Sequence, residues 1–159
     1  MAKKIRDSEH TPAGEAATEL LRAVFLFDAV LIARGDEMTA DLGLTSARWQ
    51  LLAAASGSPK SVPQLARRMS LSRQSVQRLV DLLAKSGFVR LIDNPDHVRA
   101  KLVEVTDKGV RGRAELRERQ VAWVNEVTKA MTQNELDAAR DVLTRLQAAI
   151  VQEWGRDTD

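Results

Sequence analysis

The sequence predicts a mainly α fold of the α+β class, in which helices dominate and one short β-hairpin interrupts them. Helix-forming residues such as Ala, Leu, Arg, Glu and Gln are abundant, whereas aromatic residues make up only 4% of the 159 residues. Apolar residues recur with helical spacing along most of the chain. Only the stretch from Phe88 to Val105 alternates as strands do. The length and the 44% hydrophobic content fit one domain with helical extensions.

The N-terminal part is predicted to be an arm followed by a long helix. Residues 1–13 are polar and include Pro12, which predicts a mobile arm. A helix is expected from Glu15 to about Gly35. Its large apolar side chains cover two faces, which is more than a lone surface helix needs, so packing against another subunit is one use for them. They are Ala17, Leu20, Leu21, Val24, Phe25, Phe27 and Leu31.

A helix-turn-helix is predicted in the centre of the chain. It follows a helix that Thr45 caps and that the chain breakers at residues 57–59 end. One helix of the pair is expected over residues 62–68 and the other over residues 72–86, with a tight turn between them. Gly87 suits the left-handed conformation that commonly follows a helix.

The second helix of this pair has two distinct faces. Its apolar side chains recur at helical spacing and predict a buried face; they are Val76, Leu79, Val80 and Leu83. The opposite face carries long side chains that can donate hydrogen bonds, namely Arg73, Gln74, Gln77 and Arg78. A helix that enters a DNA groove needs such donors. On this helix alone, a solvated amphipathic helix explains the pattern equally well.

The alternating stretch predicts a β-hairpin directly after the helix pair. Residues 88–92 and 102–105 are rich in apolar and β-branched side chains and predict two strands. The charged residues 93–99 between them favour turns. Two helices followed by such a hairpin form the pattern of a winged helix, with the hairpin as the wing.

Two further helices are predicted to complete the chain. The first begins at Thr106 and Asp107 and continues to about Ala130, because a cap and a first-turn carboxylate suit a helix start. Thr132 and Glu135 have the spacing of a capping box and begin the last helix. Its heptad-like seam argues for helix–helix packing; the seam consists of Leu136, Ala139, Leu143, Leu146 and Ile150.

Positive charge is concentrated in the middle of the chain. Between Lys60 and Lys101 nine basic residues stand against three aspartates, a net charge of +6. Because the whole chain carries +2, the remainder carries −4. A basic centre on an acidic frame is typical of nucleic-acid-binding modules. Ordinary fluctuation of charge along a chain is the alternative explanation.

The composition argues against an enzyme active site or a metal-binding site in this chain. The chain has no cysteine, and its two histidines, His10 and His97, lie in a tail and a turn. No nucleophile–base set, glycine-rich phosphate loop or metal-spaced ligand cluster is apparent, so no catalysis, metal or cofactor is expected. Neither a signal peptide nor a membrane-spanning run is visible. The protein is therefore expected to be soluble and cytoplasmic.

The sequence resembles the MarR family of winged helix-turn-helix regulators over roughly Glu15 to Trp154. Residues 44–52, LTSARWQLL, look like the family's second-helix opening. Residues 65–89 look like its helix-turn-helix, and residues 99–109 resemble the second wing strand and its exit. The order and spacing of the three motifs together carry the resemblance.

The resemblance implies a homodimeric, sequence-specific regulator of transcription. A single domain is expected over residues 14–159 after the arm. Residues 14–35 and 106–154 are expected to supply the dimerisation helices and residues 45–105 the DNA-binding lobe. Each subunit would place a recognition helix in a major groove of a pseudo-palindromic operator and a wing in the minor groove. A repressor released by a small, often aromatic or anionic, ligand is the expected function. A winged-helix module that binds a protein instead of DNA is the alternative.

Three groups of candidate DNA contacts follow. Arg73, Gln74, Gln77 and Arg78 are expected to read base edges, with a backbone phosphate as the alternative for Arg78. The residues expected to touch phosphates are Lys60, Arg67, Arg68, Ser72 and Ser75, and for Ser72 a pure capping role is an equal alternative. Arg99 is expected to enter the minor groove. The family wing usually has Asp-x-Arg, whereas this chain has His97 in place of the Asp. The wing contact is therefore expected to be weaker or pH-dependent.

Candidate effector-binding residues are the aromatic and cationic side chains on helices that border the family's ligand pocket. For each of them, ordinary packing in a protein core is the alternative. They are Phe25, Phe27, Arg48, Trp49 and Trp123.

Overall fold

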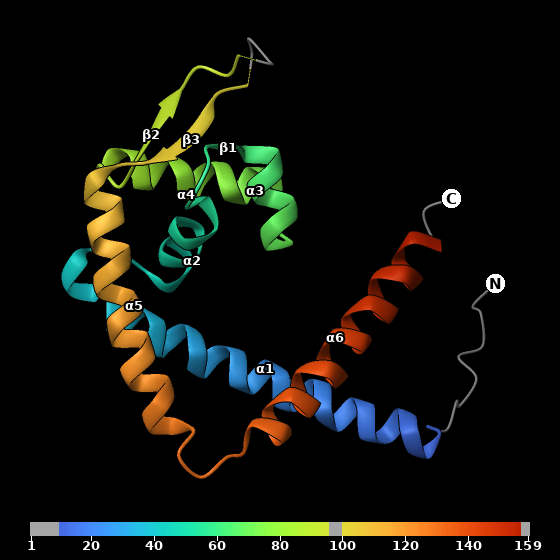
Figure 1. Ribbon diagram of the computed structural model, residues 1–159. Helices are drawn as coiled ribbons and strands as arrows, with labels where there is room; N and C mark the ends of the chain where they lie inside the picture. Colours follow the sequence, from blue (N-terminus) through green and yellow to red (C-terminus); the bar gives the residue numbers. More distant parts are fainter. Residues whose placement is uncertain (1–9, 96–99, 157–159) are drawn as a thin grey trace. The chain divides into compact units, whose positions relative to one another are not determined.

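The computed structural model describes residues 10–95 and 100–156 as a mostly helical chain with one small antiparallel sheet (Figure 1). This confirms the mainly α fold predicted from the sequence. The chain forms two compact units, one ending at Leu116 and the other beginning at Arg117. No helix in the described ranges combines the length and the apolar character that crossing a membrane requires.

The first helix is longer at both ends than predicted. Helix α1 spans Pro12–Thr39. It begins before Glu15 because the Thr11 hydroxyl accepts a hydrogen bond from the Gly14 amide at 3.0 Å and Pro12 occupies the first turn. Part of the expected arm is therefore helical, and residues 1–9 lie outside the described residues.

Gly35 does not end α1 but allows it to cross the next helix closely. Helix α2 spans Ser46–Ala55. A Cβ atom added at Gly35 would lie 2.6 Å from the Ser46 hydroxyl oxygen. One residue further on, Asp36 accepts a hydrogen bond from the Ser46 amide at 2.6 Å. The crossing thus also satisfies the first amide of α2.

A short 3-10 helix, η1 (Ala40–Leu42), links α1 to α2. Gly43 then adopts a left-handed conformation with φ of 66°. Thr45 caps α2 as predicted, because its hydroxyl accepts from the Arg48 amide. The buried Thr39 hydroxyl is hydrogen-bonded to the carbonyl oxygens of Gly35 and Leu44.

The predicted helix-turn-helix is present. Helix α3 spans Val62–Met69 and helix α4 spans Arg73–Lys85. Between them Ser70 takes a left-handed conformation with φ of 53°, which ends α3 sharply. Ser72 caps α4 by accepting a hydrogen bond from the Ser75 amide at 3.1 Å. Gly87 has a φ of 76°, as its position after α4 required.

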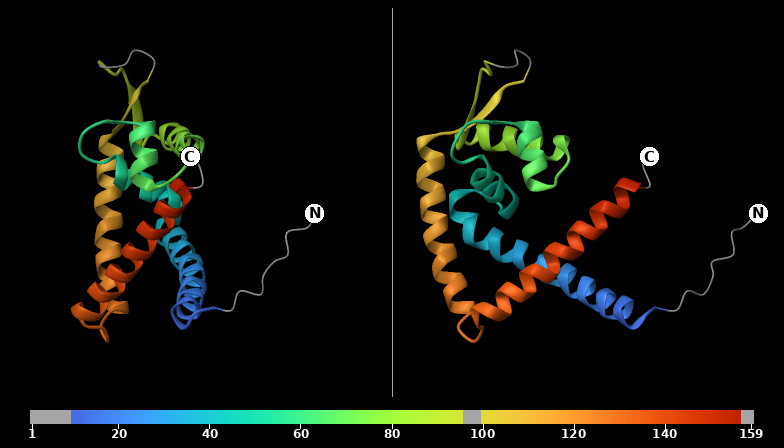
Figure 2. Two further views of the ribbon diagram at one scale, coloured as in Figure 1. Left: turned by 90° about the vertical axis from the view of Figure 1, so that its right-hand side faces the viewer. Right: turned by 45° about the vertical axis from the view of Figure 1, so that its right-hand side comes forward.

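The predicted hairpin is also present, and a third strand joins it. Strands β2 (Val89–Ile92) and β3 (Leu102–Val105) pair antiparallel. Strand β1 (Lys60–Ser61) pairs with the other edge of β3, which gives the order β1-β3-β2. Two residues are too few for an alternating pattern, so the sequence did not reveal β1. Both views of Figure 2 show the hairpin rising from the helix pair.

The core of the first unit lies beneath α4 and the sheet. Its members come from α2, α3, α4, β2, β3 and α5 (Asp107–Val127), together with Leu44 and Phe88. Helix α4 packs against α2, α3 and β2 within this core. Residues with essentially no exposed surface are Leu51, Leu52, Leu65, Val76, Val80, Leu83, Val103 and Leu116. The apolar face predicted for α4 is thus its buried face, with Leu79 packed against it from a partly buried position.

The wing is joined to α5 by a close backbone contact. The Thr106 hydroxyl lies 2.7 Å from the Gly87 carbonyl oxygen, to which it donates, and it also accepts from the Gly109 amide at 3.2 Å. A Cβ atom at Gly109 would lie 2.2 Å from the Phe88 carbonyl oxygen. The Lys108 ammonium lies 4.5 Å from the centre of the Phe88 ring, a cation–π contact. Glycine is therefore required at position 109.

The second unit contains the end of α5 and the last helix, α6 (Gln133–Arg156). Helix α5 ends at Val127, slightly before the predicted Ala130, and a turn follows. The predicted capping box begins α6. The Glu135 carboxylate accepts from the Thr132 amide and hydroxyl at 2.7 Å each, and Thr132 accepts from the Glu135 amide at 3.3 Å.

Candidate nucleic-acid interface

The outer face of α4 exposes the four residues predicted to read bases. Arg73, Gln74, Gln77 and Arg78 are all exposed, while Val76 between them is fully buried. The helix therefore cannot rotate without burying charge and exposing its core face. Burial thus fixes which side chains face outward.

The wing and α4 line one open groove. This groove has a volume of about 520 Å³, and its polar lining comes from Arg73, Gln74 and Gln77 on α4 and from Lys101 beside β3. Leu91 of β2 contributes an apolar wall. The groove brings together long donors and a cation from two different elements. The sequence predicted the α4 residues but not the place of Lys101 beside them.

A second groove lies between α3 and the wing. Its volume is about 460 Å³, and it is lined by Arg67 and Gln64 from α3 and by Asn94 and Pro95 from the start of the wing turn. Arg67 is exposed there, and Arg68 is exposed beside it. Their predicted contacts with backbone phosphates stay predictions.

Lys60 and Ser72 have structural roles that bear on their predicted phosphate contacts. The Lys60 ammonium donates to the carbonyl oxygens of Ser56 and Ser58 at 3.0 and 2.8 Å, which stabilises the end of α2. The Ser72 hydroxyl caps α4 and lies 2.8 Å from the Ser75 hydroxyl. Ser72 therefore has the capping role that was the alternative to a phosphate contact. The phosphate contacts of Lys60, Ser72 and Ser75 stay predictions.

An acidic residue that the sequence analysis did not single out lies on the outer face of α4. The Gln77 side-chain amide donates to the Asp81 carboxylate, with 2.8 Å between Nε2 and Oδ1. Both side chains are exposed. A Gln and an Asp four residues apart on a helix are neighbours, so the spacing was a readable signal in the sequence.

Two predictions concern the segment that links β2 to β3 in the sequence. Arg99 and His97 lie outside the described residues, so their roles stay predictions. At the base of the wing Arg90 and Glu104 face each other across β2 and β3 and form an ion pair. This pair joins the two strands on their outer side.

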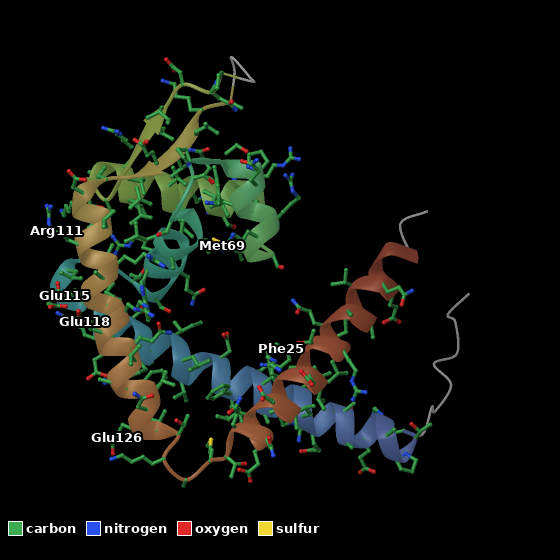
Figure 3. The ribbon with its side chains drawn as sticks, viewed as in Figure 1. Phe25, Met69, Arg111, Glu115, Glu118 and Glu126 are labelled. Atoms are coloured by element: carbon green, nitrogen blue, oxygen red, sulfur yellow. The ribbon has the colours of Figure 1, made fainter. Side chains whose placement is uncertain are left out.

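The predicted effector residues occupy different surroundings. Trp49 packs partly buried against the core, and the Arg48 guanidinium donates to the Thr45 hydroxyl at 3.3 Å. Phe25 and Phe27 are 76% and 61% exposed on α1, and Figure 3 labels Phe25 there. Trp123 belongs to the second unit. Their effector role stays a prediction.

The described residues contain no group of three or more His, Asp or Glu side chains that could hold a metal ion. Hydrogen bonds from the Thr132 amide, and to a smaller extent from the Thr132 hydroxyl, lower the pKa of the Glu135 carboxyl group. Glu135 belongs to the cap at the start of α6.

Comparison with known proteins points to one family. Residues 42–100, which include the helix-turn-helix and the first strand of the wing, match the MarR family. The uncharacterized protein Rv2011c of Mycobacterium tuberculosis is 37% identical over 134 residues, which cover 84% of this chain and 94% of that protein.

Solved structures show the same fold. A transcriptional regulator, BldR from Sulfolobus solfataricus, matches with a TM-score of 0.73 and 25% identity, over 82% of this chain and 96% of that one. A MarR mutant from E. coli complexed with operator DNA matches with a TM-score of 0.74 and 21% identity, over 80% and 93%. CouR from Rhodococcus jostii RHA1, bound to p-coumaroyl-CoA, matches with a TM-score of 0.67 and 20% identity, over 78% and 88%.

The geometry and the comparisons agree on the class of protein. An exposed donor-rich helix, a hairpin wing and a basic groove between them are the parts of a winged helix that binds DNA. Members of the matching family are transcription regulators and not enzymes. This chain belongs to the MarR family of winged-helix, DNA-binding transcription regulators.

Proposed function

We propose that the protein is a homodimeric repressor that binds a pseudo-palindromic operator and releases it when a small molecule binds. The groove that Arg73, Gln74 and Gln77 share with Lys101 of the wing carries this proposal. Arginine and glutamine on a helix can contact guanine and adenine through paired hydrogen bonds, while the cations attract the phosphate backbone. The operator complex of the related E. coli MarR supports the same use of the fold.

A dimer would use the apolar surface of α1. Phe25, Leu26, Phe27 and Val30 are each more than 60% exposed in the single chain. Several large exposed apolar side chains close together on one helix are unusual on a monomer and mark an interaction surface. Two copies would also present two recognition helices, as a palindromic operator requires.

A small-molecule effector would couple to this assembly through the predicted residues Phe25, Phe27, Arg48, Trp49 and Trp123. The related CouR holds p-coumaroyl-CoA, which is both aromatic and anionic. Arg48 is the cation of the predicted set. Aromatic acids and their thioesters are therefore the first compounds to test for release of DNA.

DNA fragments of the source genome that the purified protein retains will identify the operator. We expect binding in the nanomolar range to a site with two related halves, with an affinity that falls steeply with salt concentration. Equal affinity for every duplex would contradict the proposal. Adding candidate aromatic acids to the bound complex then tests release, and a reporter driven by the operator tests repression.

The second candidate is a winged-helix module that binds a protein partner instead of DNA. Such docking would not need the exposed cations Arg73 and Arg78 on the outer face of α4. Absence of any gel shift with genomic fragments at low salt would favour it.

A further inference from the structure

We propose that Asp81 is a positioning residue that presets Gln77 for the recognition of adenine. Gln77 lies on the wall of the groove between α4 and the wing. Its Nε2 atom donates to Asp81 Oδ1 at 2.8 Å, one helical turn further along α4. The inference rests on the proposed sequence-specific binding of DNA.

The chemistry of the pair determines which way the Gln77 amide points. An amide has a donor end and an acceptor end, whereas an ionised carboxylate only accepts hydrogen bonds. The NH₂ group of Gln77 must therefore face Asp81, and its carbonyl oxygen must face away. Without such a partner, the amide can turn over and exchange its donor and acceptor ends.

A fixed amide matters because adenine presents an ordered pair of groups. In the major groove adenine offers its N6 amino group as a donor and N7 as an acceptor. Glutamine matches both when its oxygen accepts from N6 and an N–H donates to N7. Asp81 uses one of the two amide protons, so the carbonyl oxygen and one N–H stay available for the base.

The surroundings of Asp81 support a role through Gln77. It is the one acidic residue on α4, in a segment that must approach phosphates. A bare carboxylate there would repel DNA. Arg78 and Lys85 stand at ion-pairing spacing from it on the same helix. Nevertheless, among the described residues its hydrogen bond goes to Gln77, and no ion pair joins it to either cation.

The test is base selection from a randomised duplex pool by four proteins: the wild type, Gln77→Ala, Asp81→Ala and the double variant. We expect wild-type protein to prefer adenine at one position of each half-site. Gln77→Ala should remove this preference, and Asp81→Ala should weaken it by about threefold to tenfold, as coupled neighbours do. Preferences at the other positions should stay unchanged.

The double variant separates positioning from a general loss of negative charge. If Asp81 acts through Gln77, Asp81→Ala should not change base preference further in the Gln77→Ala background. Binding to non-specific duplex should rise equally in both backgrounds, because one repulsive charge is removed. Equal thermal unfolding midpoints of all four proteins will show that the fold is intact.

Two failures can be told apart. If wild-type protein selects no sequence at all, the proposed function is wrong. If it selects a site and Asp81→Ala keeps the full preference at every position, the positioning role of Asp81 is wrong. In the free protein, the side-chain NH₂ resonances of Gln77 should also shift in Asp81→Ala, and unchanged resonances would contradict the pair in solution.

Discussion

Arg73 and Arg67 are both exposed cations, but they lie in different grooves. Arg73 lines the groove between α4 and the wing, next to Gln74, whereas Arg67 lines the groove that α3 shares with Asn94. We propose that Arg73 meets base edges and that Arg67 meets the phosphate backbone. The same residue type is therefore expected to contribute differently at the two positions.

Arg73→Ala should relax base preference at one position per half-site, because a paired contact to guanine discriminates by roughly 1–3 kcal/mol. Arg67→Ala should weaken binding to all duplexes alike and lessen the slope of log K against log salt by about 1. Competition titrations at several salt concentrations, with operator and scrambled duplexes, measure both effects. A uniform loss with Arg73→Ala would assign it to the backbone instead.

Gly109 has no room for a side chain. An added methyl group would lie 2.2 Å from the Phe88 carbonyl oxygen and 2.6 Å from Val105 Cγ1, so backbone must shift. Gly109→Ala should therefore lower the free energy of unfolding by about 1–3 kcal/mol, as overpacking does. Urea unfolding measures the change.

Arg113→Ala, an exposed position on the same helix, is the matched control and should change unfolding by less than about 0.5 kcal/mol. If Gly109→Ala were as stable as the wild type, the junction between the wing and α5 would be looser than the structure indicates.

At the scale of elements, most helix starts depend on one polar side chain near the first turn. Thr11 caps α1, Thr45 caps α2 and Ser72 caps α4. Each satisfies an amide that the helix itself cannot pair. The start of α6 differs, because its cap includes the ionisable Glu135, which makes that start sensitive to pH.

The pKa of Glu135 is lowered from 4.5 by the Thr132 amide and hydroxyl, so the folded state holds its proton less tightly than the unfolded state. Its contribution to stability is therefore complete above pH 4.5 and is lost as pH falls through the lowered folded pKa. An NMR titration of the Glu135 carboxyl group should give a midpoint below the ordinary value. Thr132→Ala removes the hydroxyl but keeps the amide, so that midpoint should return only part of the way toward 4.5. An unshifted wild-type midpoint would contradict the cap.

At the scale of the whole molecule, the exposed apolar side chains of α1 are the main reason to expect a second copy. Phe25→Glu should place a charge in that surface and weaken self-association by at least tenfold, because a buried unpaired charge is costly. Sedimentation at several protein concentrations measures the dimer constant. Leu82→Glu, an exposed apolar position on α4, is the control and should leave association unchanged.

A wild-type protein that sediments as a monomer at micromolar concentration would overturn the dimer proposal. If Phe25→Glu dimerised as tightly as the wild type, the interface would not include this part of α1.

Where the governing interactions are local, the sequence by itself determined the structure. The caps at Thr45 and Ser72, the two faces of α4 and the left-handed Gly87 all depend on residues within about one helical turn. For this reason the helix-turn-helix and the outward set on α4 could be predicted. The hairpin could be predicted from the alternation within each of its strands and the turn-forming residues between them. The Gln77–Asp81 pair was equally local and was readable by its spacing.

Only the tertiary structure decided the features that join distant parts of the chain. Gly35 was predicted to end the first helix, but it lies inside α1, where Ser46 packs against it. Strand β1 exists only because β3 lies beside it. The same is true of Gly109 below Phe88 and of Lys101 in the groove with Arg73. Each of these contacts joins residues at least ten positions apart, a separation at which helical and strand periodicity carries no information. The sequence therefore predicted the recognition helix, and the fold decided which residues of the wing lie beside it.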